Sequence, residues 1–175
     1  MTRIQVVNQL IQQHSQGAYA MAVQMLRCKD EAQDVIQDAC YALLRQARLP
    51  TDSSQFRMLL FKVVRNKVID RVRAQKIRRS EPLNEETVAA SDQDNPEAYW
   101  QQQQTKVSIK QALAALSMEH RDIILLKDWQ GFSYAEIANI LEIEAGTVMS
   151  RLHRARLALR QQMQLCQSEV KVSHD

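Results

Sequence analysis

Residues that break helices are scarce in this chain, and their scarcity restricts its fold more than any other feature. Only three prolines and three glycines occur in 175 residues, and Pro50, Pro82 and Pro96 all fall between segments with a regular apolar pattern. Proline removes a backbone donor and clashes inside a helix, so it marks places where helices stop. Most other residues are good helix formers such as Ala, Leu, Gln, Arg and Glu. The sequence therefore predicts an all-α fold.

The apolar spacing of the first half predicts an N-terminal bundle of four helices. The clearest stripe indicates a helix from about Asp30 to Arg48. Asp52 and Gln55 fit a capping box that opens a long helix, and two shorter helices, separated near Gly17, are expected upstream. The stripes are Ile4, Val7, Leu10 and Ile11; Tyr19, Ala22, Val23 and Leu26; Ala32, Val35, Ile36, Ala39, Cys40, Leu43 and Leu44; and Phe56, Leu60, Val64, Val68 and Val72.

Charge divides the chain into two small helical domains. Nine basic residues between Arg57 and Arg79 stand against the single acid Asp70, whereas residues 80–104 carry six acids and no base. A dense basic block favours a polyanionic partner, because each neutralised phosphate releases counterions, although a solvated helix face is the alternative. The acidic stretch has no apolar period and predicts a flexible linker. The expected parts are 1–79, the linker 80–104, a second domain at 105–168 and a tail at 169–175.

Several classes of protein are disfavoured. No run approaches the roughly 18 apolar residues of a membrane helix, and the N-terminus lacks the apolar core of a secretion signal, so we expect a cytoplasmic chain without membrane insertion. Cys28, Cys40 and Cys166 are scattered, which predicts neither disulfides nor a metal site. No phosphate-binding loop or nucleophile with a base is visible, so neither a cofactor nor enzymatic activity is expected.

Residues 131–160, GFSYAEIANILEIEAGTVMSRLHRARLALR, predict two short helices joined by a turn. Ser133 and Glu136 fit a capping box, so the first helix should begin at Tyr134 and end near Leu141. The second should run on from Gly146 and bury one apolar stripe. This arrangement matches a DNA-reading helix-turn-helix, with a basic surface helix as the alternative. The stripe is Val148, Leu152, Ala155 and Leu159; the outward positions are Ser150, His153 and Arg154, with Met149 and Thr147 flanking them near the N-terminal end, and Arg151 and Arg156, nearer the flanks, suit phosphate contacts.

The two halves together resemble the extracytoplasmic-function (ECF) group of bacterial sigma factors, small two-domain initiation subunits of RNA polymerase. The run LSMEHRDIILLKDWQGFSYAEIANILEIEAGTVMSRLHRARLALR is similar to sigma region four. DEAQDVIQDACYALL followed by FRMLLFKVVRNKVIDRVR is similar to region two. The resemblance covers nearly the whole chain, with both regions in order around the acidic linker.

The resemblance implies a function and a set of site residues. The chain would bind core RNA polymerase and promoter DNA, initiate transcription of a specific regulon without hydrolysing nucleotide, and be held inactive by an anti-sigma factor. A sigma-like decoy that binds an anti-sigma factor without initiating transcription is the alternative. The implied contacts are Asp34, Val35, Gln37 and Asp38 for core polymerase; Asn66 as base reader with Arg65, Lys67, Arg71 and Arg73 for the minus-ten element; and Thr147, Met149, Ser150, Arg151, His153 and Arg154 for the minus-thirty-five element.

Four positions depart from the family pattern. Leu59 stands where Trp is usual, Met149 where a basic residue is frequent, Glu142 where Gly is common and Glu144 where a Ser cap is common. The first two put a stacking contact and one minus-thirty-five contact in doubt. The last two predict a strained or differently capped turn.

Overall fold

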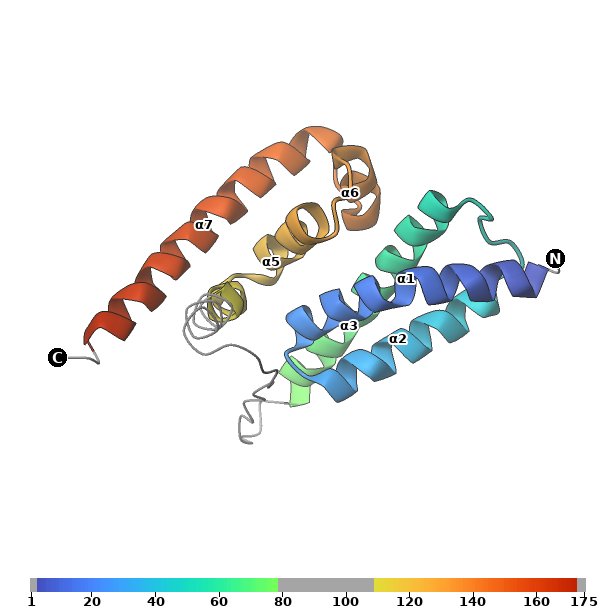
Figure 1. Ribbon diagram of the computed structural model, residues 1–175, viewed down its shortest axis with the longest axis horizontal. Coiled ribbons are helices and arrows are strands. Elements are labelled where there is room, and N and C mark those ends of the chain that lie inside the picture. The colour runs from blue at the N-terminus through green and yellow to red at the C-terminus, as the bar shows by residue number, and fades with distance from the viewer. Residues whose placement is uncertain (1–2, 79–108, 173–175) are drawn as a thin grey trace, which may run out of the picture. The chain divides into compact units, whose positions relative to one another are not determined.

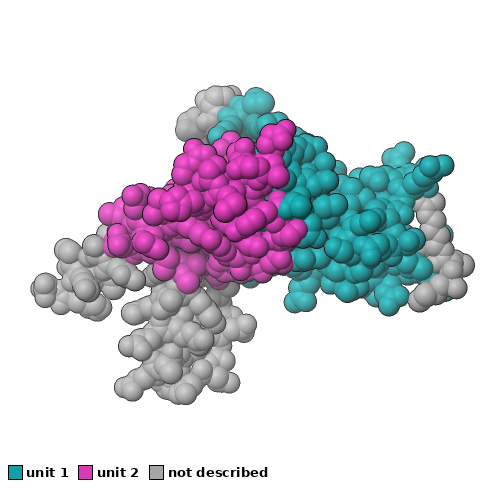
Figure 2. Space-filling model, turned by 90° about the horizontal axis from the view of Figure 1, so that it is seen from above, with its two compact units in different colours: residues 1–86, 135–143 teal, residues 87–134, 144–175 magenta. Residues whose placement is uncertain are grey.

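The computed structural model describes residues 3–78 and 109–172, which form helices joined by short turns and loops (Figure 1). No strand occurs in these two ranges, which confirms the all-α prediction. The predicted linker at 80–104 and the last residues of the predicted tail lie outside them. Two compact units are present (Figure 2): residues 1–86 with 135–143, and residues 87–134 with 144–175. No helix in the described part is long and apolar enough to cross a bilayer.

The N-terminal part of the first unit is a bundle of α1 (Arg3–Leu26), α2 (Lys29–Leu44) and α3 (Ser53–Arg78). Each of these helices packs against the other two. The apolar stripes that the sequence indicates for α2 and α3 meet α1 at the centre, where burial of each large side chain contributes about 1.5–3 kcal/mol. The buried residues are Val7, Leu10, Ala18, Met21, Ala22, Met25, Ala32, Val35, Ala39, Leu43, Phe56, Leu60, Phe61, Val64 and Val68.

The prediction of two short helices separated near Gly17 is wrong, because α1 is continuous through that residue. A glycine inside a helix costs only about 1 kcal/mol. Ala18, Met21 and Met25 continue at helical spacing the face that buries Val7 and Leu10, so packing along the whole helix outweighs that cost. Residues 3–78 therefore contain three helices rather than four.

The ends of α2 and α3 follow from local signals. The Asp52 side chain accepts a hydrogen bond from the backbone amide of Gln55 at 2.8 Å, which confirms the predicted cap of α3. Helix α2 ends at Leu44, four residues before the predicted end. Asp30 and Glu31 occupy its first turn, where carboxylates interact favourably with the helix dipole.

The second unit contains a helix at 109–115, α5 (Met118–Ile124), the π-helical turn η1 (Leu125–Trp129) and α7 (Ala145–Val172). Ser117 caps α5, as predicted, by accepting a bond from the amide of His120 at 3.3 Å. Helices α5 and α7 pack against each other. Helix α6 (Tyr134–Leu141), which begins at the predicted residue, precedes α7 in the chain.

Arg121 ties α5 to the end of the preceding helix. Its guanidinium is buried and donates to the carbonyl oxygens of Leu113 at 2.8 Å, Ala114 at 2.7 Å and Leu116 at 3.0 Å. The last carbonyls of a helix have no partner within the helix itself. The arginine therefore supplies donors to these carbonyls where burial excludes water, and the carbonyl of Leu113 also accepts from the amide of Leu116 at 3.2 Å.

Candidate nucleic-acid interface

Helix α7 presents an exposed polar face near its N-terminus. Met149, Ser150, His153 and Arg154 are exposed, whereas Thr147 and Arg151 are half-buried at its edges. These positions lie within the first three turns of the helix, which is the part of a recognition helix that reaches base edges in the major groove. The structure thus brings the predicted minus-thirty-five residues together on one side of one helix.

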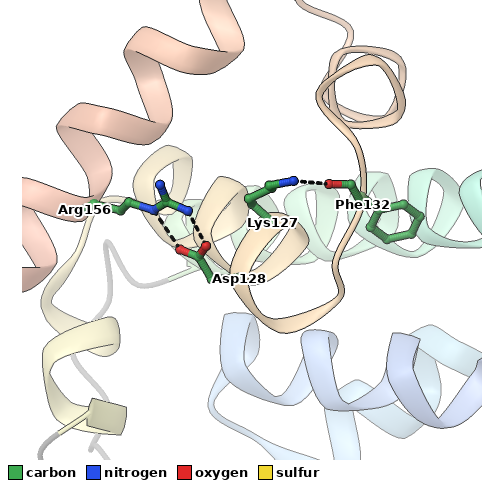
Figure 3. A network of polar contacts seen from close by, with 4 residues as sticks. All are labelled: Lys127, Asp128, Phe132 and Arg156. Atoms are coloured by element: carbon green, nitrogen blue, oxygen red, sulfur yellow. Dashed lines mark hydrogen bonds and ion pairs between the residues drawn. The ribbon is translucent and has the colours of Figure 1, made fainter.

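The opposite face of α7 is fixed to its unit. Val148, Leu152 and Ala155 are buried along it, at the predicted spacing. Arg156 pairs with Asp128 of η1 through two hydrogen bonds, one of them between Nε and Oδ2 at 3.1 Å (Figure 3). The hydrogen bonds that Arg156 donates to the Asp128 carboxylate raise the pKa of Arg156 above its usual value. Arg156, expected to contact phosphate, directs two of its donors toward Asp128 and stays 50% exposed.

A second polar network shapes the segment before α6. The ammonium of Lys127 donates to the carbonyl oxygen of Phe132 at 3.1 Å (Figure 3) and lies 4.7 Å from the centre of the Tyr134 ring. Gly131 has φ of 71°, a left-handed conformation that glycine adopts without steric cost. The side chain of Phe132 is completely buried. This turn is therefore stabilised by the Lys127 hydrogen bond and by burial of the Phe132 ring, and Gly131 allows its left-handed backbone.

The turn between α6 and α7 ends in a left-handed residue that is not glycine. Glu142 has φ of 55°, and the amide of Ile143 donates to the carbonyl of Ala138 at 3.1 Å. This is the Schellman pattern, in which glycine is usual at the left-handed position. Of the two outcomes expected for this turn, strained or differently capped, the left-handed φ of Glu142 agrees with the strained one, at a cost of about 1 kcal/mol. At the start of α7, the backbone amide of Thr147 donates a hydrogen bond to the carbonyl of Glu144 at 2.9 Å.

The basic helix α3 carries the predicted minus-ten residues, but it does not place them all on one face. Asn66 and Arg73 are exposed and seven residues apart, so they share a face. Arg65 and Lys67 are half-buried on either side, and Arg65 Nη1 lies 3.5 Å from Asn66 Oδ1. At about 100° per residue, Arg71 is rotated about 140° away from Asn66.

Arg71 faces α2 instead. Its Nη1 lies 3.8 Å from Oδ2 of Asp34, and one turn further along, Gln75 donates to Glu31 Oε1 at 2.6 Å. The Asp34 carboxylate is thus 63% exposed on the surface of α2 and at the same time lies near the guanidinium of Arg71 on α3. A predicted polymerase contact and a predicted DNA contact are therefore neighbours in one ion pair.

The remaining predicted polymerase residues of α2 divide into two groups. Gln37 and Asp38 are exposed, together with Gln33 and Asp34. Val35 is only 1% exposed and lies in the core of the bundle. The part of the α2 surface that carries Gln37 and Asp38 is thus polar and acidic, and Val35 can support it only from within.

Sequence reasoning missed the turn η1 and the contacts that Lys127 and Asp128 make from it. The amide of Gln130 donates to the carbonyl of Leu125 at 3.0 Å, the wider spacing of a π-helix. Asp128 and Arg156 are 28 residues apart, and no periodic pattern connects them. The opposite charges of Asp128 and Arg156 are visible in the sequence, but they do not indicate that these two side chains pair.

Comparison with known proteins agrees with both halves of the fold. The family description "Sigma-70 region 2" matches residues 10–78, and "Sigma-70, region 4" matches residues 106–159. The ECF RNA polymerase sigma factor SigL of Mycobacterium tuberculosis is 31% identical over 156 residues, which are 89% of this chain and 87% of SigL. SigM of the same species is 30% identical over 152 residues, 87% of this chain and 74% of SigM. SigE of Mycolicibacterium smegmatis is 29% identical over 167 residues; the match takes in 95% of this chain but only 65% of SigE.

Solved structures give the same result. The sigma factor RpoE of Bartonella quintana, in complex with the anti-sigma factor NepR, is similar with a TM-score of 0.69 and 26% identity over 90% of this chain and 96% of that one. CnrH, in complex with the cytosolic domain of CnrY, shares the fold with a TM-score of 0.62, covering 91% of this chain and 88% of CnrH at 22% identity. Both sigma regions are present in order, on the helices that carry the predicted contact residues. The chain therefore belongs to the ECF family of RNA polymerase sigma factors.

Proposed function

We propose that this chain is an alternative sigma factor, which binds core RNA polymerase, recognises minus-thirty-five and minus-ten promoter elements, and initiates transcription of a specific regulon. The observation that carries the proposal is the exposed face of Ser150, His153 and Arg154 on a helix whose other face is buried, in a chain with both sigma regions. The chain supplies no catalytic groups of its own in this proposal. It acts in the cytoplasm as a binding subunit, without a cofactor.

The minus-thirty-five element would be read by α7. Arg154 can bond guanine O6 and N7, and Ser150 and His153 can bond base edges or phosphates. The backbone of α7 is held by its buried face and by the pair between Asp128 and Arg156, so little ordering is needed when it enters the groove. Thr147 and Arg151, at the edges of the face, suit phosphate contacts that fix register.

The minus-ten element would be read by α3. Asn66 is exposed, and its amide can both donate to and accept from the edge of an unstacked base. Arg73 shares its face, and Arg65 and Lys67 flank it, where cations would attract the phosphates of the separated strand. Arg71 would join them only after leaving Asp34. Binding of the single strand offsets the cost of unpairing, so no nucleotide is hydrolysed.

The polar surface of α2 would bind core polymerase through Asp34, Gln37 and Asp38, while Val35 holds that surface in place from the core. RpoE was solved with an anti-sigma factor. By analogy, we propose that an anti-sigma factor regulates this chain as well, by covering the surfaces that bind polymerase and DNA.

The test is transcription in vitro. The purified chain is mixed with bacterial core polymerase and fragmented host DNA, and transcripts that begin only when the chain is present are sequenced. Specific starts are expected. Arg154→Ala should weaken promoter binding about 5- to 150-fold, the value of one bidentate base contact. Asn66→Ala should abolish opening of the promoter while complexes at the minus-thirty-five element persist.

Matched controls separate these effects from a general loss of charge or amide groups. Asn8→Ala on α1 and Arg48→Ala after α2 change exposed residues outside the proposed contacts, so both should retain the starts. If the wild-type chain gives no specific start and forms no complex with core polymerase, the proposal is wrong. An anti-sigma complex formed by such a chain would then favour the decoy.

A further inference from the structure

Met149 is an apolar side chain placed among polar ones on the exposed face of α7. It is 63% exposed, and it directly precedes Ser150. His153, also exposed, follows one turn later on the same side. A single exposed apolar residue on a protein surface is ordinary. Met149, however, lies near the N-terminus of α7, where the neighbouring exposed side chains are proposed to contact base edges. An apolar side chain at this position would also face a base, and its chemistry limits which base it can favour.

The thioether of Met149 restricts what it can recognise. It has no donor, and its sulfur is only a weak acceptor, so it cannot distinguish the amino, carbonyl and ring-nitrogen groups of base edges. The major groove presents one apolar group, the C5 methyl of thymine. The unbranched, polarizable methionine side chain adapts to such a surface. Thymine is therefore the base whose edge complements Met149.

Helix geometry limits where that thymine can lie. Residues four apart on a helix have Cβ atoms about 5–6 Å apart, and successive base pairs are about 3.4 Å apart. Met149 and His153 are four apart, as are Ser150 and Arg154. The thymine should thus lie within about two base pairs of the one that His153 contacts.

We propose that Met149 is a specificity-determining residue that selects a thymine in the minus-thirty-five element through apolar contact with its C5 methyl group. This inference rests on the proposed function of α7 as the minus-thirty-five reader. Burial of one methyl group against the thioether is worth about fourfold in affinity. Met149 therefore adjusts the choice between promoters without supplying much of the total affinity.

The experiment uses holoenzyme assembled from the full chain and core polymerase, with a promoter found by the transcription test. Each thymine of the minus-thirty-five element, on either strand, is replaced in turn by deoxyuridine, which lacks only the C5 methyl. Affinity is measured by fluorescence anisotropy of labelled promoter. One replacement should weaken the wild-type holoenzyme about fourfold. Met149→Ala should weaken binding to the thymine promoter by a similar factor and lose the response to that replacement.

A matched control is Leu165→Ala, which removes another exposed apolar side chain of α7, 57% exposed and four turns beyond Met149. This variant should keep the wild-type response to deoxyuridine. If no replacement weakens the wild-type holoenzyme, or if Met149→Ala keeps the same response, the inference is wrong while specific transcription still supports a sigma factor. If the holoenzyme recognises no promoter at all, both the inference and the proposed function fail.

Discussion

Replacing Arg121 with methionine should destabilise the second unit by about 3–5 kcal/mol. Arg121 is 9% exposed and donates three hydrogen bonds to the carbonyls that end the preceding helix, two of them buried and one part-buried. A hydrogen bond from a charged donor contributes about 1.5–3 kcal/mol, and a buried acceptor left without one costs about 1–3 kcal/mol. Methionine keeps most of the apolar stem, so the loss comes mainly from the two buried bonds, with a smaller part from the third.

Such a loss is a large part of the stability of a unit of this size, since folded domains are stable by about 0.05–0.15 kcal/mol per residue. Fluorescence isolates the effect. Trp129 lies in η1, and neither tryptophan of the chain, Trp100 or Trp129, belongs to α1, α2 or α3, so the emission change serves as the signal for unfolding of the second unit. In a urea titration, the fluorescence transition of Arg121→Met should move to much lower urea, while part of the far-ultraviolet circular dichroism signal keeps its wild-type transition.

Two further variants sharpen this test. Arg160→Met removes an exposed arginine from α7 and should change the unfolding free energy by less than about 0.5 kcal/mol. Arg121→Lys keeps the charge but not the planar fork that serves several acceptors at once, so it should lose about half as much as methionine. An Arg121→Met variant whose fluorescence transition stays within about 1 kcal/mol of wild type would show that these bonds do not hold the helix end.

Three other outcomes follow from the structure. His14, whose Nε2 lies 2.9 Å from Ser53 Oγ, has a pKa lowered from 6.5 mainly by burial; the unfolded chain binds the proton first, so the stability of the first unit should fall as pH drops below 6.5 and level off below the folded pKa. Hydrogen exchange in α1 should show this fall, and His14→Gln should abolish it. A double-mutant cycle of Asp128→Asn and Arg156→Met should give a coupling of about 0.5–1 kcal/mol in urea titrations, because the two side chains are 36% and 50% exposed; a coupling near zero would contradict the pairing. Glu142→Gly should be more stable than Glu142→Ala by about 1 kcal/mol in the same assay, because only the backbone preference at φ of 55° distinguishes them; equal midpoints would argue against strain.

Features set by neighbouring residues could be predicted from the sequence. The cap of α3 at Asp52 and the cap of α5 at Ser117 depend on side chains three residues from the amides they bind. The stripe from Phe56 to Val68 needed only the helical period. The continuity of α1 through Gly17 could not be read in the same way, because the free energy that keeps the helix intact comes from α2 and α3.

The contact sites also divide into features that follow from the local sequence and features that depend on how helices pack. The outward positions of Ser150, His153 and Arg154 follow from the period of α7. The same period, applied to α3, is enough to separate Arg71 from Asn66. The pairing of Arg71 with Asp34 could not be found in this way, since it depends on how two helices cross.

Six consecutive residues of the second unit have no side facing water. Arg121, Asp122, Ile123, Ile124, Leu125 and Leu126 are all buried, so this segment is enclosed on every side. During synthesis these residues leave the ribosome well before α7, against which α5 packs. The helices of the bundle at 3–78 come first and can fold as the chain emerges. The run IILL (residues 123–126) cannot be buried against α7 until α7 has been synthesised. Until then, its apolar side chains favour aggregation of the unfinished chain and binding by chaperones.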